Sequence, residues 1–306
     1  MLGFISFFIF VWVIINLKTS RPDGVPIFKI HPYRRLMFYI MPSRTESLVY
    51  FKRDVRADKF LDYIAKQPED ISANETHLLL ASIGKTLEEH VEMNRFVSGR
   101  TLYQRNGVWI SFSMKRQKQD KKSAIAMVKM RYQSNASFRD FSKHVNDEIH
   151  IQRSGTKTYA DKEFAFFNRI PRPFLNLGVK LFKLVDYYNL LPTSFIENDG
   201  LYTSVILANL GSLKMEPGYH HLFEWGNCPV FITVGQIKMK PVVEDGKVVA
   251  KKVLPLRLSY DERIDDGLTA KDALERLVEI LENPEEHLGE NIQPNDSISS
   301  LKDPCT

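Results

Sequence analysis

The chain has 306 residues, of which 43% are hydrophobic and 26% are charged, and its formal net charge is +5. This length and balance suit a globular protein with one large core or two small ones. No basic segment contains the interleaved aromatic residues of a nucleic-acid stacking platform, so we expect no nucleic-acid partner. The two cysteines, Cys228 and Cys305, have no C-x-x-C neighbour. That pattern argues against a metal site or a disulfide framework and favours a reducing compartment.

The N-terminus is an uncharged apolar run over residues 1–17, close to the lower length limit of a membrane-spanning helix. Only the amino terminus places a positive charge before this run, whereas Lys18 and Arg21 follow it, and no small-residue cleavage site is visible. We therefore predict a single-pass transmembrane anchor in the cell membrane, with the remaining chain in the cytoplasm. A short buried helix is the alternative. Residues 18–29 are predicted to be a linker, because they are rich in turn-forming residues.

The middle of the chain mixes helices and strands. Alternation of apolar and polar residues predicts strands over 47–55 and 108–114, and an Asp245-Gly246 pair predicts a hairpin turn. Apolar residues at helical spacing predict a helix over 78–87, behind a capping-box pattern at residues 72–75. Because these elements follow no regular βαβ rhythm, we predict an α+β fold with a mixed sheet.

Residues 164–191 form a strongly apolar segment with four basic residues placed among the hydrophobic ones. These are Arg169, Arg172, Lys180 and Lys183. Three interpretations remain open. The segment is a core helix whose lysines extend to solvent, a helix in a membrane interface, or the wall of a tunnel for an acyl chain.

The C-terminal third contains the most informative pattern. An alternating strand over 254–260 runs into the sequence DERIDDG at 261–267, and a helix follows that is predicted to begin with Thr269 as N-cap and to end at Asn283-Pro284. Residues 289–306 are polar and predicted to be a disordered tail. The sequence at 261–267 resembles the D-H-R-x-x-D-G motif of the acyltransferase (E2) subunits of 2-oxoacid dehydrogenase complexes. It also resembles the H-H-x-x-x-D-G motif of chloramphenicol acetyltransferase.

Four further segments resemble the E2 catalytic domain in the same order along the chain. The sequence LANLG at 207–211 is similar to the family's I-S-N-L-G, and residues 229–243 are similar to one of its strands. The sequence LENP at 281–284 matches the family's closing L-E-N-P. Residues 79–94 are similar to its helix that ends in H-P-E-x-N. The resemblance covers residues 30–288. It implies a chloramphenicol acetyltransferase-like α+β domain, a homotrimer with active sites between subunits, and coenzyme A or acyl-CoA as substrate. It implies no metal, and we expect no lipoyl domain.

Two positions depart from the family pattern. The histidine that takes the proton in these families is Glu262 here, and the serine that binds the oxyanion is Ala208. A glutamate is about two pKa units less basic than a histidine. The loss of one oxyanion donor typically reduces the rate ~10²–10³-fold. Both changes weaken the chemistry of the family unless other groups replace the lost ones.

The remaining site residues implied by the resemblance match it. Asp266 is expected to help hold the catalytic site, and Asn209 and Gly211 to form the turn that faces the oxyanion. The other matching residues at the motif are Asp261, Arg263 and Gly267. An Asp-Arg-Asp cluster at a strand end is also often an internal ion-pair network that fixes a turn, and that role would persist without catalysis.

His220 and His221 are candidate replacements for the missing histidine. They lie in an apparent insertion over 215–225, just after the turn at 209–211. The alternative is that both are ordinary surface-loop residues.

Two functions therefore remain open from the sequence. The first is a divergent CoA-dependent acyltransferase at the cytoplasmic membrane face, with Glu262 as base and a membrane-associated or long-chain acyl substrate. The second is a catalytically inactive trimeric scaffold or acyl-CoA sensor of the same fold.

Overall fold

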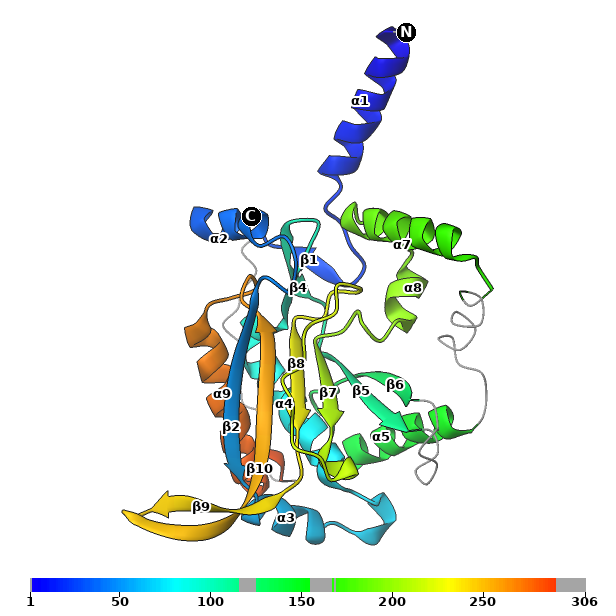
Figure 1. Ribbon diagram of the computed structural model, residues 1–306. Coiled ribbons are helices and arrows are strands. Elements are labelled where there is room, and N and C mark those ends of the chain that lie inside the picture. Colours follow the sequence, from blue (N-terminus) through cyan, green and yellow to red (C-terminus); the bar gives the residue numbers. More distant parts are fainter. Residues whose placement is uncertain (1, 116–124, 155–166, 168, 290–306) are drawn as a thin grey trace.

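The computed structural model describes residues 2–115, 125–154, 167 and 169–289, and its centre is a mixed β-sheet (Figure 1). The strand order of this sheet is β2-β10-β8-β7-β5-β6, with β9 paired to the outer part of β10. The neighbours β5, β7 and β8 run parallel, and the remaining pairs are antiparallel. A second, three-stranded sheet has the order β1-β4-β3.

The strands are β1 (Gly24–Pro26), β2 (Leu48–Arg56), β3 (Arg95–Ser98), β4 (Thr101–Arg105), β5 (Trp109–Lys115), β6 (Ile125–Arg131), β7 (Val205–Asn209), β8 (Val230–Val234), β9 (Lys238–Glu244) and β10 (Lys247–Asp261). The helices are α1 (Leu2–Leu17), α2 (Pro32–Ile40), α3 (Asp58–Ala65), α4 (Glu75–Glu89), α5 (Phe138–Arg153), α7 (Arg172–Tyr187), α8 (Thr193–Asn198), α9 (Gly267–Glu282) and α10 (Pro284–Leu288). The predicted mixed α+β architecture is confirmed.

The core lies between the large sheet and the helices α4 and α9, which pack side by side on one of its faces (Figure 1). β8 is buried along its whole length because β7 and β10 flank it and helices cover it. The inner half of β10 is buried in the same way, whereas its outer half pairs only with β9 and projects from the body as a hairpin (Figure 1). The turn of this hairpin is at Asp245 and Gly246, as predicted, and both have positive φ angles.

Two helix starts differ from the prediction. α4 begins after Asn74, whose side chain accepts a hydrogen bond from the Thr76 backbone N–H, and not after Ser72. α9 begins three residues earlier than predicted, because Asp266 is its N-cap in place of Thr269. In both cases an Asx side chain caps the helix where a hydroxyl residue was expected.

The N-terminal segments also differ from the prediction. Residues 18–29 do not form a free linker, because Gly24–Pro26 is a strand and the Arg21 side chain is buried. Arg21 bonds Asp23 at 3.0 Å and Asp186, on α7, at 2.9 Å. α1 is apolar but has 16 residues, and within the described parts of the chain no helix meets the length and hydropathy expected of a membrane span. The predicted tail from residue 290 onward lies outside the described residues.

Candidate active site

The turn after β10 is held by a buried ion pair. Arg263 donates from Nε and Nη2 to the two carboxylate oxygens of Asp261, at 2.8 and 2.7 Å. The Ser47 hydroxyl donates to the same carboxylate at 2.8 Å, and Arg263 Nη1 donates to the Met41 carbonyl at 3.0 Å. Both charged side chains are buried, so each depends on the other for its missing solvation. This geometry fixes the shape of the turn and leaves neither group available to a substrate.

Asp265 and Asp266, later in the same turn, are also engaged. Asp265 accepts hydrogen bonds from Arg34, on α2, at 3.0 Å and from Arg95, on β3, at 2.7 Å. Asp266 accepts from the backbone N–H groups of Leu268 and Thr269, each at 3.1 Å, and these bonds lower its pKa. Asp266 therefore caps α9. Its part in holding a catalytic site stays a prediction.

Gly267 is the first residue of α9. A Cβ added there would meet only the Tyr260 hydroxyl, at an ordinary contact distance of 3.8 Å. Nothing in the local packing explains why glycine occupies this position.

Glu262 differs from its neighbours. Its backbone N–H donates to the Ser47 carbonyl at 2.9 Å, which ties the chain down, but its side chain is exposed. Among the described residues, no hydrogen bond or ion pair engages its carboxylate. Burial, with Glu262 and Asp266 nearby, raises the pKa of the Tyr260 hydroxyl to about 12. The turn thus presents one free carboxylate to the surface.

The turn at 208–211 begins with the last two residues of β7. Ala208 is half-buried, and the Asn209 side chain donates to the Thr76 hydroxyl at 3.1 Å and accepts from the Ser212 N–H at 3.2 Å. A Cβ on Gly211 would lie 2.6 Å from the Gly235 carbonyl oxygen, so only glycine fits without movement. The Ser212 hydroxyl, close to the position of the lost serine, donates to the Asn209 carbonyl at 2.8 Å. This turn is rigid but offers no free hydroxyl at its surface.

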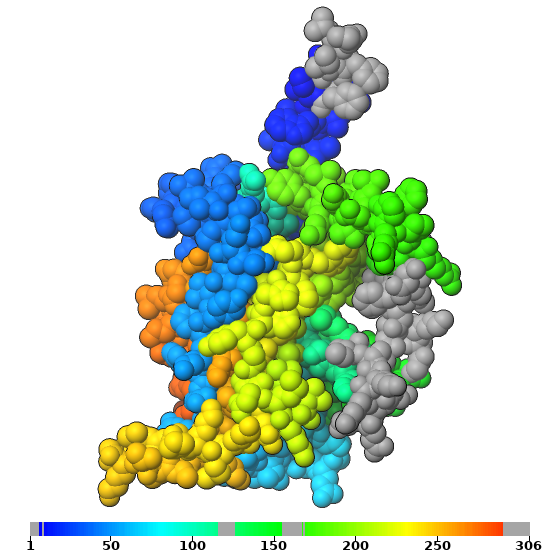
Figure 2. Space-filling model, viewed as in Figure 1, coloured from blue at the N-terminus to red at the C-terminus, as the bar shows by residue number. Residues whose placement is uncertain are grey.

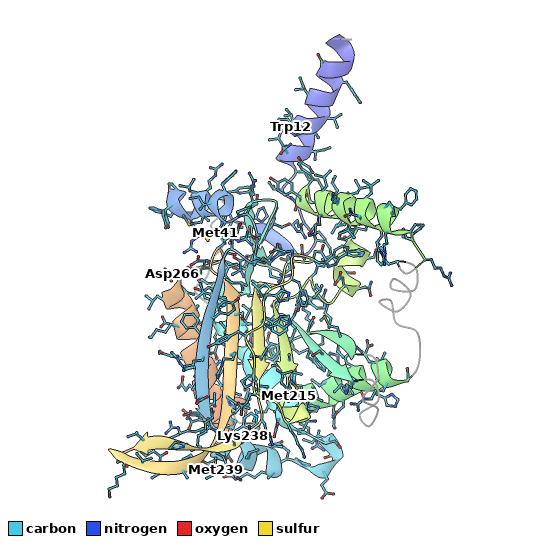
Figure 3. All side chains as sticks on the ribbon, viewed as in Figure 1. Trp12, Met41, Met215, Lys238, Met239 and Asp266 are labelled. Carbon is cyan, nitrogen blue, oxygen red and sulfur yellow. The ribbon has the colours of Figure 1, made fainter. Side chains whose placement is uncertain are left out.

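The two halves of the predicted site lie at opposite ends of the sheet. Ala208 pairs with Thr233 on β8, and Thr233 pairs with Arg257 on β10, four residues before Asp261. Two strand spacings of ~4.8 Å and four residue rises of ~3.3 Å give roughly 16 Å between Ala208 and Asp261. Figure 3 shows the same separation, with Met215 near one end of the sheet and Asp266 near the other. A single chain therefore does not bring the position of the lost serine next to Glu262.

The two histidines lie on the sheet face opposite the helices. The His220 ring stacks on Phe231 with a centroid distance of 4.0 Å, and its Nδ1 lies 2.6 Å from the His221 carbonyl oxygen. His221 is exposed. Among the described residues, neither histidine bonds Glu262. The same loop contacts the segment beside the motif turn, because Arg44 donates to the Phe223 carbonyl at 3.0 Å, and Ser47 of that segment bonds Asp261.

Sequence reasoning missed the residues that join the motif turn to its surroundings. Asp265 stands at a variable position of the motif, so the resemblance gave no reason to select it, and its partners Arg34 and Arg95 are distant in sequence. The described residues contain no group of three or more histidine, cysteine or acidic side chains placed to bind a metal.

Comparison with known proteins supports the sequence resemblance in its C-terminal part. Residues 225–289 match the family model of the 2-oxoacid dehydrogenases acyltransferase (catalytic domain). A dihydrolipoyllysine-residue acetyltransferase component of the pyruvate dehydrogenase complex from Staphylococcus aureus is 46% identical over 52 residues. That match spans 17% of this chain and only 12% of the Staphylococcus protein.

The similarity of structure extends over most of the chain. A probable dihydrolipoamide acetyltransferase from Listeria monocytogenes has a TM-score of 0.57 at 14% identity, covering 88% of this chain and 98% of that one. A chloramphenicol acetyltransferase has a TM-score of 0.50 at 10% identity, covering 84% and 99%. The chain has the fold of an E2 acyltransferase core. The predicted fold class is thereby confirmed for the acyltransferase-like domain.

Proposed function

We propose that this protein is a divergent CoA-dependent acyltransferase in which Glu262 accepts the proton of the nucleophile. One observation carries the proposal. Of the four acidic residues in the motif turn, Asp261, Asp265 and Asp266 are each engaged in holding the fold, and Glu262 alone presents a free carboxylate. It stands where the related families have their catalytic histidine.

The reaction follows from the chemistry of a thioester. A thiol or hydroxyl acceptor would give its proton to the Glu262 carboxylate as its sulfur or oxygen attacks the acyl carbon. The tetrahedral intermediate would then break the bond to sulfur, and the CoA thiolate would leave and take the proton back from Glu262. Coverage of Glu262 by another subunit would assist this proton transfer, because a carboxylate withdrawn from water is a stronger base.

We further propose that the active unit is a homotrimer. About 16 Å separates the 208–211 turn from the motif turn within one chain. A site that uses both turns therefore needs two copies, as in the families that the sequence resembles.

A membrane-associated or long-chain acyl substrate is the class we propose. α2, whose outer side chains are apolar and exposed, is joined directly to the motif turn by the Arg34–Asp265 ion pair and by the Arg263 bond to the Met41 carbonyl. An acceptor or acyl chain held at an apolar surface would therefore reach the protein close to Glu262.

The test is CoA release from acyl-CoAs of several chain lengths, using full-length protein in mild detergent with lipid extract as acceptor. We expect turnover that falls at least 100-fold in Glu262→Gln, since general-base catalysis supplies ~10²–10⁴-fold. Turnover that is unchanged in Glu262→Gln would remove Glu262 from the mechanism. Ala208→Ser combined with Glu262→His restores both family groups and is expected to increase the rate.

A second candidate is an inactive trimeric scaffold or acyl-CoA sensor. The observation that favours it is Ala208, because the nearby hydroxyls of Ser212 and Thr233 already donate to the carbonyls of Asn209 and Gly218. If no acyl-CoA is turned over, while titration calorimetry detects acyl-CoA binding to a folded trimer, this second function replaces the first.

A further inference from the structure

α7 carries apolar residues on two of its sides. One side packs inward, where the Phe182 ring stacks on Trp225 at a centroid distance of 4.2 Å. The other side is exposed at helical spacing, and its members are Phe174, Leu177, Leu181 and Leu184. Leu177 is 65% exposed, and the stripe members one turn away on either side, Phe174 and Leu181, are exposed as well. Because the inner side fixes the rotation of the helix, the outer apolar stripe is a permanent surface of this protein.

α2 presents a second apolar surface in the same way. Phe38 is buried, and Arg34 is bonded to Asp265, so the opposite side of the helix faces outward. That side contains Tyr33, Leu36, Tyr39 and Ile40. Like α7, α2 is held by contacts to the folded domain while its outer stripe stays exposed.

The two helices meet around the turn between β3 and β4. The Arg100 guanidinium lies over the Tyr39 ring of α2, 4.7 Å from its centroid. On the other side, a Cβ added to Gly99 would lie 2.3 Å from the carbonyl oxygen of Tyr187, at the end of α7. The turn therefore fits closely between α2 and α7 and fixes their relative position.

α1 leaves the molecule at the same end (Figure 2). It contains no charged residue, and its exposed Trp12 stands clear of the folded domain (Figure 3). Its C-terminal end is docked, because the Asn189 side chain donates to the Lys18 carbonyl at 2.9 Å and Arg21 pairs with Asp186. A recess of about 380 Å³ lies between the base of α1, α2 and the end of α7.

Positive charge accompanies these apolar surfaces. Lys18, Arg35 and Arg100 line the recess. On α7, exposed Lys180 lies one turn from Leu177 and from Leu184, and exposed Lys183 is the sequence neighbour of Leu184. α1 and α2 contain no acidic residue, and the single one in α7, Asp186, is paired with Arg21. An apolar surface with a basic border and exposed tyrosines matches the interface of an anionic bilayer.

We propose that the outer sides of α2 and α7, with the base of α1 and the five basic residues Lys18, Arg35, Arg100, Lys180 and Lys183, form a membrane-docking face for anionic phospholipid. α1 enters the bilayer, the apolar stripes of α2 and α7 lie in the headgroup and upper acyl region, and the basic residues contact lipid phosphates. The proposal deepens the membrane-associated function proposed above and places Glu262 at the bilayer surface. Charge and continuity with α1 favour lipid over a second copy of the chain.

The test uses an environment-sensitive fluorophore on a single cysteine of the full chain. Cys305→Ser removes one native cysteine, and Cys228 is buried. The probe is placed at Leu177→Cys on α7, at Leu36→Cys on α2 and, as a matched control, at Val243→Cys on the hairpin, which is 72% exposed at the other end of the molecule. Protein is reconstituted into phosphatidylcholine vesicles, with or without phosphatidylglycerol, that contain doxyl-labelled lipid as quencher.

We expect quenching at positions 177 and 36 and none at 243. The double variant Lys180→Gln/Lys183→Gln should lower the ratio of docked to undocked protein on anionic vesicles by an order of magnitude or more. This follows because each basic residue near an anionic surface contributes about 1 kcal/mol. Lys247→Gln with Lys252→Gln, on the hairpin, should leave it unchanged. Absence of quenching at positions 177 and 36 in vesicles, or shielding of these probes only as the protein concentration rises in detergent, would overturn the proposal. Glu262→Gln should dock normally, so loss of turnover and loss of docking are separate outcomes.

Discussion

The motif turn at 261–267 and the membrane-docking face depart from the usual burial pattern in opposite ways. In the turn, charged side chains are buried and paired, as with Asp261 and Arg263. On the docking face, Leu36, Leu177 and other large apolar side chains are exposed. Buried charges that are fully paired are explained by the fold itself. Exposed apolar stripes on helices of fixed rotation are not explained by the fold, and they require something outside the chain. The comparison teaches that the kept motif residues are weak indicators of activity, because the fold alone accounts for them, whereas the exposed apolar face is a stronger indicator of where the protein works.

The largest effect should come from breaking the paired charges. Asp261→Ala leaves the Arg263 guanidinium buried without its carboxylate, and we expect a loss of about 3–5 kcal/mol in the free energy of unfolding. Urea-induced unfolding in mild detergent measures it. The double variant Asp261→Ala/Arg263→Met should cost clearly less than the sum of the single variants, because no unpaired charge remains. A cost below about 1 kcal/mol for Asp261→Ala would show that the pair does not hold the turn.

The next effect tests how firmly the docking face is joined to the domain. Gly99 has a φ of +54° and packs against the Tyr187 carbonyl. Gly99→Ala should therefore cost about 2–3 kcal/mol, of which about 1–2 come from the backbone conformation alone. Gly246→Ala, with a φ of +75° and no atom near the added Cβ, supplies that backbone part as a control. Equal costs at the two positions in thermal or urea unfolding would mean that the turn does not hold α7.

The elements around the motif turn were predicted well from the sequence. The strand into the motif, the Asp245-Gly246 hairpin and the ending of α9 all rest on local signals, such as alternation and turn residues, that act within a few positions. The partners of Asp265 could not be predicted, because Arg34 and Arg95 meet it only through the tertiary fold.

The segments that form the membrane-docking face were predicted only in part. The pattern of residues 164–191 left core, interface and tunnel open, because helical periodicity shows an apolar stripe but not which side of it meets protein. α7 has both a packed and an exposed stripe, and the tertiary contacts of the inner one, such as that of Phe182 with Trp225, distinguish them. The treatment of 18–29 as a linker failed for a similar reason, since the burial of Arg21 depends on Asp186, far along the chain.

A smaller effect is expected at the start of α9. Asp266→Ala removes the cap of the helix and should cost about 1 kcal/mol at neutral pH. The capping bonds lower the pKa of Asp266 below its ordinary value of 3.8. Its stabilising contribution is therefore complete above pH 3.8 and is lost as the pH falls through the lower folded value. Unfolding measured across this range should show the variant and the wild type converging in acid. Asp266→Asn, which retains a good cap, should remain close to the wild type at neutral pH.

The smallest effect on stability, and the largest on function, should come from Glu262. Its carboxylate is exposed and makes no hydrogen bond or ion pair with the described residues, so Glu262→Gln should change the free energy of unfolding by less than about 0.5 kcal/mol. The same variant should lose acyl transfer if the glutamate is the base. Unfolding, subunit number by sedimentation and CoA release measured on one preparation separate these effects. A variant that is inactive because it unfolds or dissociates would place Glu262 with Asp261 as a residue of the fold. A stable, trimeric and inactive variant would set it apart from every other acidic residue of the turn.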